Sequence, residues 1–160
     1  MINRRTLLKG ALLAPVAFGA APLFADTVVR SALVSSNLVY LSPIQRKGLS
    51  SCQAEVWYVM LGADIFVCTD ASSWRARAPA RGVTSTRLWV GDLGVWKRVN
   101  YQSLPSTTAT ASIETDAIVI EQALAQFGRK YSAEWDTWGP RFRRGLADGS
   151  RTLLRYRLDA

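Results

Sequence analysis

Residues 65–81 read IFVCTDASSWRARAPAR, and this segment decides how the rest of the chain is interpreted. Residues 65–69 are apolar and rich in β-branched and aromatic side chains, which predicts a half-buried strand. Ser72 or Ser73 then offers a hydroxyl that caps a short basic helix, and Pro79 limits the length of that helix. We therefore expect a strand followed at once by a short helix.

Hydroxyl and guanidinium groups gather where this strand meets this helix. Thr69 ends the strand, Ser72 and Ser73 open the helix, and Arg75 and Arg77 lie within its first turn. Such donors together form a plausible cradle for an anionic phosphate. The alternative is an ordinary solvated basic helix, because the segment lacks the glycine pattern of a nucleotide-binding loop.

Residues 1–25 resemble a twin-arginine export signal, in which Arg4 and Arg5 precede a modest apolar segment and cleavage follows Ala25. We therefore expect one mature domain over residues 26–160, a periplasmic or secreted location, and no stable membrane span after the signal is removed. A short membrane anchor or a buried helix is the alternative, although Pro15 interrupts the apolar run.

Charge and residue counts exclude several functions. Removal of residues 1–25 lowers the net charge from +8 to +5, and no long Lys/Arg run occurs, so no nucleic-acid partner is expected. The chain has no histidine, which excludes Ser-His and Cys-His catalysis and His-ligated zinc or haem. Cys52 and Cys68 are too few for a thiolate metal site and are expected to be free, largely buried thiols.

Short strands and turns follow one another along the chain. Strands are expected at 38–42, 51–61, 65–69, 86–90, 95–99, 112–115 and 152–158. Residues 45–48 and 61–64 read as turns, the latter pairing Leu61 with Asp64; residues 91–94 form a hairpin loop and residues 103–112 a polar loop. Along 51–61, Val56, Tyr58 and Met60 share one face, and apolar residues on the other face predict burial on both sides.

Two helical segments interrupt the strands. Asp116 caps an amphipathic helix that ends near residues 128–131, and a last helical piece follows, broken by Gly139 and Pro140. Residues 26–37 are ambiguous between a helix and an irregular lead-in. The chain is therefore expected to be mainly β, a small antiparallel barrel with two or three helices over its openings.

The ordered set of segments resembles the FMN-binding split barrel of the pyridoxamine 5'-phosphate oxidase-like superfamily. The similarity covers roughly residues 38–158. It rests on segments 54–59, 65–69, 72–77, 88–92 and 127–131, which read AEVWYV, IFVCT, SSWRAR, LWVGD and FGRKY. No single motif among them is decisive.

This resemblance implies a flavin phosphate held by Thr69, by Ser72 or Ser73, and by Arg75 and Arg77, and it implies a homodimer. Trp74 lies within the same cofactor-binding segment, where family members carry a smaller or basic residue. The second set of basic and Gln residues that binds the vitamin substrate in the family oxidases is absent. FMN is the expected cofactor, with a deazaflavin or no cofactor as alternatives; haem-binding relatives commonly use a His ligand.

Two functional hypotheses follow. The first is an exported flavin-dependent oxidoreductase acting on a small-molecule substrate, with no assigned catalytic residue. The second is a non-catalytic split-barrel binding module that has lost its cofactor.

Tyr131 is either a proton donor or a residue that caps a helix. Four tryptophans form either a stacking wall for a flat ring or part of the core: Trp57, Trp74, Trp89 and Trp96.

Overall fold

The computed structural model describes residues 21–45, 48–49 and 54–159. Within them, eight strands form one antiparallel sheet in the order β2-β1-β6-β7-β8-β5-β4, and β3 also pairs with β1. The strands are β1 (Leu38–Gln45), β2 (Gly48–Leu49), β3 (Ala54–Trp57), β4 (Val59–Leu61), β5 (Asp64–Asp70), β6 (Ser85–Val90), β7 (Ser106–Glu114) and β8 (Arg151–Leu158).

The sheet curls into a nearly closed barrel, which confirms the mainly-β prediction. β3 and β4 lie at opposite edges of the strand order, yet only Tyr58 separates them in the chain. The two edges of the sheet are therefore tied together at Tyr58, and closure reduces the length of unpaired strand edge.

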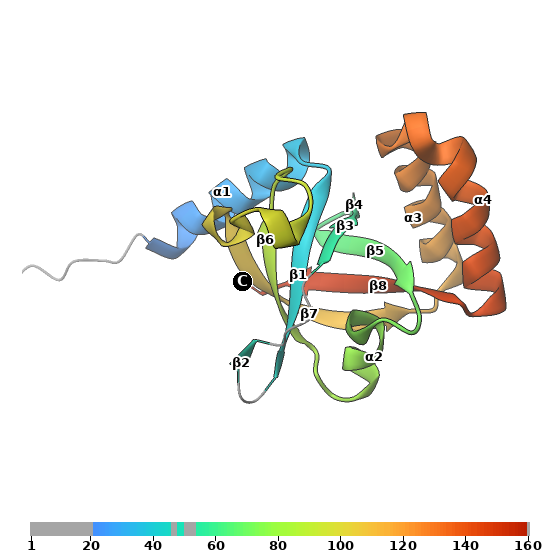
Figure 1. The fold of residues 1–160 in the computed structure, drawn as a ribbon, viewed down its shortest axis with the longest axis horizontal. Helices are drawn as coiled ribbons and strands as arrows, with labels where there is room; N and C mark the ends of the chain where they lie inside the picture. Colours follow the sequence, from blue (N-terminus) through green and yellow to red (C-terminus); the bar gives the residue numbers. More distant parts are fainter. Residues whose placement is uncertain (1–20, 46–47, 50–53, 160) are drawn as a thin grey trace, which may run out of the picture.

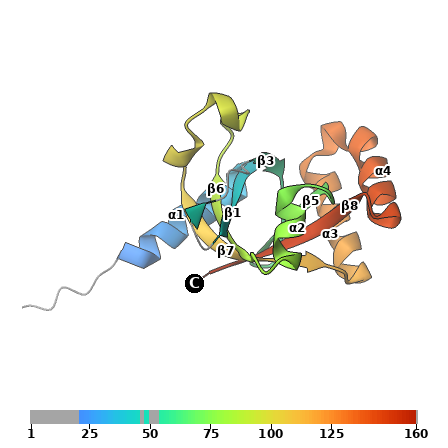
Figure 2. The same ribbon diagram turned by 60° about the horizontal axis from the view of Figure 1, so that its bottom comes forward.

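Four α-helices surround the barrel in the described part of the chain, rather than the expected two or three. They are α1 (Ala21–Ser35), α2 (Trp74–Ala80), α3 (Ala117–Lys130) and α4 (Ser132–Asp148). Figures 1 and 2 show α1 on one flank of the barrel and the α3–α4 pair on the other, while α2 lies at the lower side in Figure 1. None of the described helices is both long and apolar enough to cross a membrane.

The apolar side chains form two layers because β5 is buried on both faces. Ile65 and Val67 point into the barrel interior, whereas Phe66 and Cys68 pack beneath α3 and α4. An apolar residue at every position of a strand is what burial on both sides requires. The continuous apolar run that predicted this strand thus has a direct structural cause.

The predicted strand over residues 51–61 is divided at Tyr58, and its first residues, Cys52 among them, lie outside the described part. The expected Leu61–Asp64 pairing is confirmed. The predicted faces also persist across the break, because Val56, Tyr58 and Met60 contact the barrel interior.

The predicted hairpin over residues 91–99 is wrong. A short 3-10 helix, Trp96–Arg98, stands in place of the returning strand, and a second one follows at Tyr101–Ser103. The reason is that both edges of β6 are already occupied, one by β1 and the other by β7. A strand returning from β6 would have no free edge to pair with.

The predicted polar loop over residues 103–112 is also wrong, since β7 covers Ser106–Glu114. Small residues alternate along it, and Ala109 and Ala111 face the barrel interior where they are buried. Thr108, Thr110 and Ser112 alternate with them on the other face. The strand was missed because its interior residues are small, so the segment has too low a hydrophobicity to stand out as a strand.

The predicted break in the last helix does not occur, and α4 continues through Pro140 as a single helix. Gly139 serves packing instead of ending the helix, because a Cβ there would lie 2.9 Å from the Trp135 ring. A Cβ at Gly128 of α3 would meet the same ring at 2.8 Å. These two glycines therefore allow Trp135 to fill the space where α3 and α4 meet.

Candidate functional site

The connection between β5 and α2 holds all six residues that the sequence singled out for cofactor binding. Thr69 is the penultimate residue of β5, and Trp74 is the first residue of α2, so the strand and helix are confirmed in their predicted order. The structure nevertheless divides the six side chains among several environments: Thr69, Ser72, Ser73, Trp74, Arg75 and Arg77.

Thr69 and Arg75 form the central contact of this connection. Arg75 Nε donates a hydrogen bond to Thr69 Oγ1 at 2.7 Å, and the Thr69 side chain is 2% exposed. The bond orients the guanidinium and reduces the rotamer entropy that binding an anion would cost. Thr69 thus acts as a buried anchor for Arg75, whose remaining N–H groups have no hydrogen-bond acceptor among the described residues.

The two serines are largely used by local structure. Ser72 Oγ donates to Asp70 Oδ1 at 2.6 Å, and the Ser72 amide donates to the same oxygen at 2.7 Å. Hydrogen bonds from Ser72, followed by the nearby Arg151 and Arg75 charges, hold the pKa of Asp70 below its ordinary value. Ser73 Oγ accepts the Ala76 amide at 3.3 Å, as the predicted helix cap does.

Trp74 turns away from this cluster toward a separate hollow of about 650 Å³ between α2 and the β1–β6 edge. Its indole Nε1 is buried and has no hydrogen-bond partner among the described residues. The Arg81 guanidinium lies 5.7 Å from the indole centroid. A buried N–H without an acceptor is rare in folded proteins.

Arginines line the hollow that lies nearest to the phosphate candidates. It has a volume of about 470 Å³ between α2, β7 and β8, and Arg77, Arg81 and Arg151 line it without any acidic side chain among its lining residues. Arg81 and Arg151 were missed by the sequence reasoning. The signal for Arg151 is the pairing of β5 with β8, which places it opposite Asp70.

Cys68 lies beside Arg151 on the outer face of β5 and is a free thiol, as predicted for this cysteine. Burial raises the pKa of the Cys68 thiol to about 12, against a lowering effect of the Arg151 charge and hydrogen bond. A thiol with so high a pKa is a poor nucleophile at neutral pH. Cys68 therefore has a packing role and is not a catalytic candidate.

The four tryptophans do not form a common wall. Trp57 stacks on Tyr131 at 4.4 Å between ring centroids, whereas Trp89 packs with Tyr40 and Tyr101, and Trp96 packs against that cluster. Trp74 is separate from both groups. Core packing is therefore the observed role of Trp57, Trp89 and Trp96.

Tyr131 is a structural residue where α3 ends and α4 begins, which supports the capping alternative. Its hydroxyl accepts the Tyr58 amide at 3.0 Å and lies 2.7 Å from the Asn37 carbonyl and 2.8 Å from the Tyr58 carbonyl. Burial raises the pKa of Tyr131 above its ordinary value. The hydroxyl thus stays neutral and bridges the two barrel edges at Tyr58.

Comparison with solved structures identifies the fold. HutZ, a heme storage protein from Vibrio cholerae, superposes with a TM-score of 0.57 at 15% identity, covering 85% of this chain and 91% of its own. A candidate pyridoxamine 5'-phosphate oxidase from Listeria innocua has a TM-score of 0.54 at 11% identity, with 86% and 94% covered. General Stress Protein 26 from Bacillus anthracis has a TM-score of 0.53 at 13% identity, with 85% and 89% covered.

The chain has the split-barrel fold of these structures. No protein-family model and no curated protein matches its sequence. The fold that the resemblance predicted is therefore confirmed by structure, at sequence identities too low to carry a function across.

Proposed function

We propose that this protein is an exported flavin-binding split barrel that uses FMN, or a deazaflavin, as an oxidoreductase acting on a small organic substrate. The observation that carries the proposal is the Thr69–Arg75 contact beside an arginine-lined hollow, at the end of β5. These are the strand end and the basic segment at which the family resemblance places the flavin phosphate.

The residues present fit a phosphate group. Arg75 is oriented by a buried hydroxyl, and Arg77, Arg81 and Arg151 surround a hollow of about 470 Å³. Guanidinium groups bind phosphate through paired, charge-assisted hydrogen bonds. Asp70 bonds locally to Ser72, and the charges of Arg75 and Arg151 also act on it. Arg151 contacts Cys68 and the Trp138 and Phe142 rings as well, so Arg77 and Arg81 are the more exposed guanidinium groups of the hollow.

A bound flavin would supply the chemistry of accepting or donating an electron pair. The part of this chain would be to hold the phosphate and to orient the ring. Arg77, Arg81 and Arg151 line the hollow and would hold the phosphate there. Arg75 does not line this hollow, and it would add its charge from the neighbouring position where Thr69 orients it.

Two of the structural neighbours are named as heme proteins, HutZ and a heme binding protein from Mycobacterium smegmatis. This chain has no histidine, so a haem would lack the imidazole ligand that most such sites use. The chemistry of the donor set therefore favours a flavin phosphate over a haem iron.

The first experiment is the visible absorption spectrum of the protein purified after native export, with mass analysis of any chromophore released on denaturation. We expect a flavin or deazaflavin spectrum. A colourless protein that stays colourless after incubation with FMN would contradict the proposal and would favour the binding module that has lost its cofactor.

The second experiment tests the cradle itself by titration with FMN and with riboflavin, which lacks the phosphate. We expect the double variant Arg75→Ala, Arg77→Ala to weaken FMN binding by about 100-fold, because each lost charge-assisted bond costs on the order of 1.5 kcal/mol. Riboflavin affinity should change little. The matched control is Arg98→Ala, Arg157→Ala, which removes the same charge from exposed positions outside the cradle.

Equal losses of affinity for FMN and riboflavin in the cradle variant would contradict a phosphate cradle at this position. A loss of FMN affinity in the control variant as large as in the cradle variant would contradict it as well.

The homodimer that the resemblance implies is part of the same proposal. Light scattering on the purified protein should report twice the mass of one mature chain, and a monomer at micromolar concentration would contradict it.

A further inference from the structure

A third hollow lies away from α2, beside the turn between α3 and α4, which is in the upper part of Figure 1. Its volume is about 520 Å³, and it opens between the start of β1 and the segment that follows β6. The side chains that matter for its chemistry are Trp57, Asp92, Lys130, Tyr131 and Glu134.

Lys130 is the basic residue of this hollow, and an aromatic ring faces its amine. Nζ lies 3.5 Å from the centroid of the Tyr58 ring and 5.6 Å from that of Tyr131. Within the described ranges, no ion pair or hydrogen bond involves this nitrogen. A neighbouring hollow of about 350 Å³ is also lined by Lys130, so this side chain lies between two hollows.

The surroundings of Lys130 favour the neutral amine. Burial lowers the pKa of Lys130 to about 8, against a raising effect of the Asp92 charge. About a quarter of such an amine is neutral at pH 7.5, compared with about one part in a thousand for an ordinary lysine. The neutral amine is the form that attacks a carbonyl carbon.

We infer that Lys130 forms an imine with an uncharged aromatic aldehyde that binds in the hollow at the α3–α4 turn. The amine nitrogen attacks the carbonyl carbon, the carbon–oxygen bond breaks, and the oxygen leaves as water with both amine protons. The product is a carbon–nitrogen double bond, and no electrons are gained or lost. Hydrolysis reverses the step.

The lining of the hollow selects the class of carbonyl compound. The carboxylates of Asp92 and Glu134 disfavour an anionic oxo acid, because like charges repel at short range. Asp92 is held in place by the Asn37 and Leu38 amides, which donate to Oδ1 at 2.8 and 2.9 Å. The rings of Trp57 and Tyr131 offer apolar and aromatic contact area to a flat ligand.

This site is separate from the proposed flavin cradle. A second lysine of the same protein, Lys97, serves as an internal control. Lys97 is an exposed lysine whose amine lies 5.4 Å from the Trp96 ring, so it also has an aromatic neighbour, but it lines neither of the two hollows that Lys130 lines. The experiment treats the full-length protein at pH 7.5 with benzaldehyde and sodium cyanoborohydride, which traps the imine as a stable secondary amine. Peptide mass mapping then gives the labelling rate of each lysine.

We expect Lys130 to label at least 10-fold faster than Lys97, on the basis of the larger neutral fraction of its amine. The rate at Lys130 should saturate with benzaldehyde concentration and should fall when benzyl alcohol, which has no carbonyl group, is added. The rate at Lys97 should rise linearly and should ignore benzyl alcohol. Lys130→Arg, which keeps the charge, should remove the saturable component.

Equal rates at the two lysines would overturn the inference. A fast but linear rate at Lys130, unaffected by benzyl alcohol, would overturn it as well, because it would show a reactive amine without a binding site. Both readouts come from the folded wild-type protein, so neither depends on the folding of a variant. Neither outcome bears on FMN binding at α2.

Discussion

At the scale of single residues, buried tyrosine hydroxyls and the backbone groups that they contact hold the two barrel edges together. Tyr58 interrupts the strand, and the hydroxyl of Tyr131 takes up its backbone N–H and lies beside its carbonyl. The Tyr58 hydroxyl in turn lies 2.8 Å from the Leu33 carbonyl at the end of α1. One pair of tyrosines therefore connects α1, the barrel edge and the α3–α4 turn.

Tyr131→Phe should lower the free energy of unfolding by about 1–3 kcal/mol, because it leaves the buried backbone groups of Tyr58 without their partner. Urea denaturation followed by tryptophan fluorescence measures the change. Tyr101→Phe is the matched control, since the Tyr101 ring is 8% exposed and its hydroxyl makes no hydrogen bond with the described residues. A loss as large in the control would contradict the role given to the Tyr131 hydroxyl.

Lys130 gives stability a pH dependence of defined sign. Its pKa is about 8 in the folded protein and 10.5 in the unfolded chain, so the unfolded chain binds more protons between these values. The free energy of unfolding therefore gains a contribution from Lys130 as pH rises from 8 to 10.5, and loses it as pH falls through 8.

Lys130→Met should remove that contribution. The difference in melting temperature, variant minus wild type, should become more negative as pH rises from 7 to 10.5. Lys97→Met is the control and should show a constant difference over this range. A pH-independent difference for Lys130→Met would contradict the lowered pKa.

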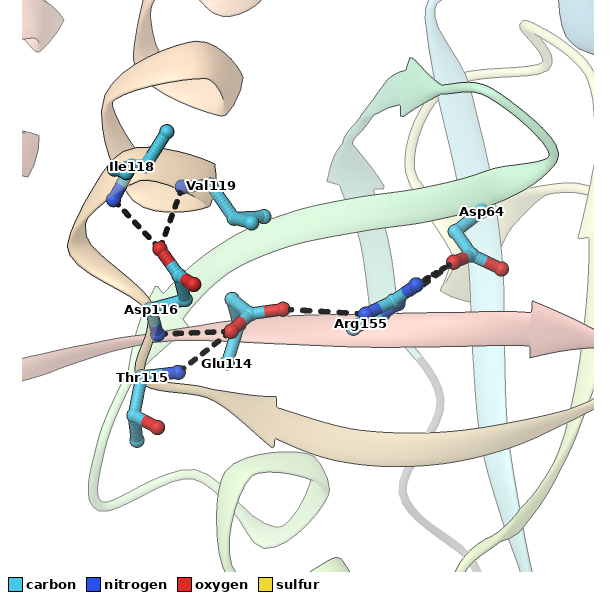
Figure 3. A network of polar contacts seen from close by, with 7 residues as sticks. All are labelled: Asp64, Glu114, Thr115, Asp116, Ile118, Val119 and Arg155. Atoms are coloured by element: carbon cyan, nitrogen blue, oxygen red, sulfur yellow. Dashed lines mark hydrogen bonds and ion pairs between the residues drawn. The ribbon is translucent and has the colours of Figure 1, made fainter.

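At the scale of secondary-structure elements, an arginine on β8 connects three strands, as Figure 3 shows. Arg155 Nε donates to Asp64 Oδ2 of β5 at 2.6 Å, and its Nη1 lies 3.6 Å from Glu114 Oε2 of β7. Glu114 Oε1 also accepts the Thr115 and Asp116 amides, and Asp116 caps α3 through the Ile118 and Val119 amides. The network thereby sets where β7 ends and α3 begins.

Arg155→Met should lower the free energy of unfolding by about 1–3 kcal/mol. The side chains of Asp64 and Glu114 are 13% and 10% exposed, so water only partly replaces the lost guanidinium. Arg157→Met on the same strand is the control, because Arg157 is exposed and should tolerate the change within about 0.5 kcal/mol. A similar cost in both variants would show that the network adds no stability.

The elements that the sequence predicted correctly are those whose signal is local. Four consecutive residues of β5, 65–68, are apolar, and the helix after Asp116 has both a capping residue and a 3.6-residue period. The strand predicted at 112–115 overlaps the end of β7, but the first part of β7 and the 3-10 helix at Trp96–Arg98 were predicted wrongly. Their conformation depends on which edges of β6 are free, and no local pattern carries that information.

At the scale of the whole molecule, we propose that residues 1–25 export a split barrel that binds a flavin. Proteins exported by the twin-arginine route are folded before translocation, which suits a protein that acquires its cofactor in the cytoplasm. Signal and cofactor remain two separate proposals, because the first concerns residues 1–25 and the second the connection between β5 and α2.

Export is tested by replacing Arg4 and Arg5 with lysine. In cells that carry the twin-arginine machinery, we expect the wild-type mature chain, beginning at Asp26, in the exported fraction. The variant should fall at least 10-fold in that fraction and accumulate uncleaved inside. Equal export of both forms would contradict the twin-arginine assignment, and an uncleaved wild-type chain would contradict cleavage after Ala25.

The sequence alone determined the barrel class, the buried β5 strand, the basic segment beside it and the exclusion of histidine chemistry. Each of these depends on composition or on a short-range pattern. Only the tertiary structure decided that the Thr69 hydroxyl accepts a hydrogen bond from Arg75 and that Trp74 lines a different hollow. It also placed Arg81 and Arg151 with Arg77 around the arginine-lined hollow. Lys130 likewise gained its significance from Tyr58, 72 residues earlier in the chain. Side-chain contacts across strands depend on register and barrel closure, which no single segment encodes.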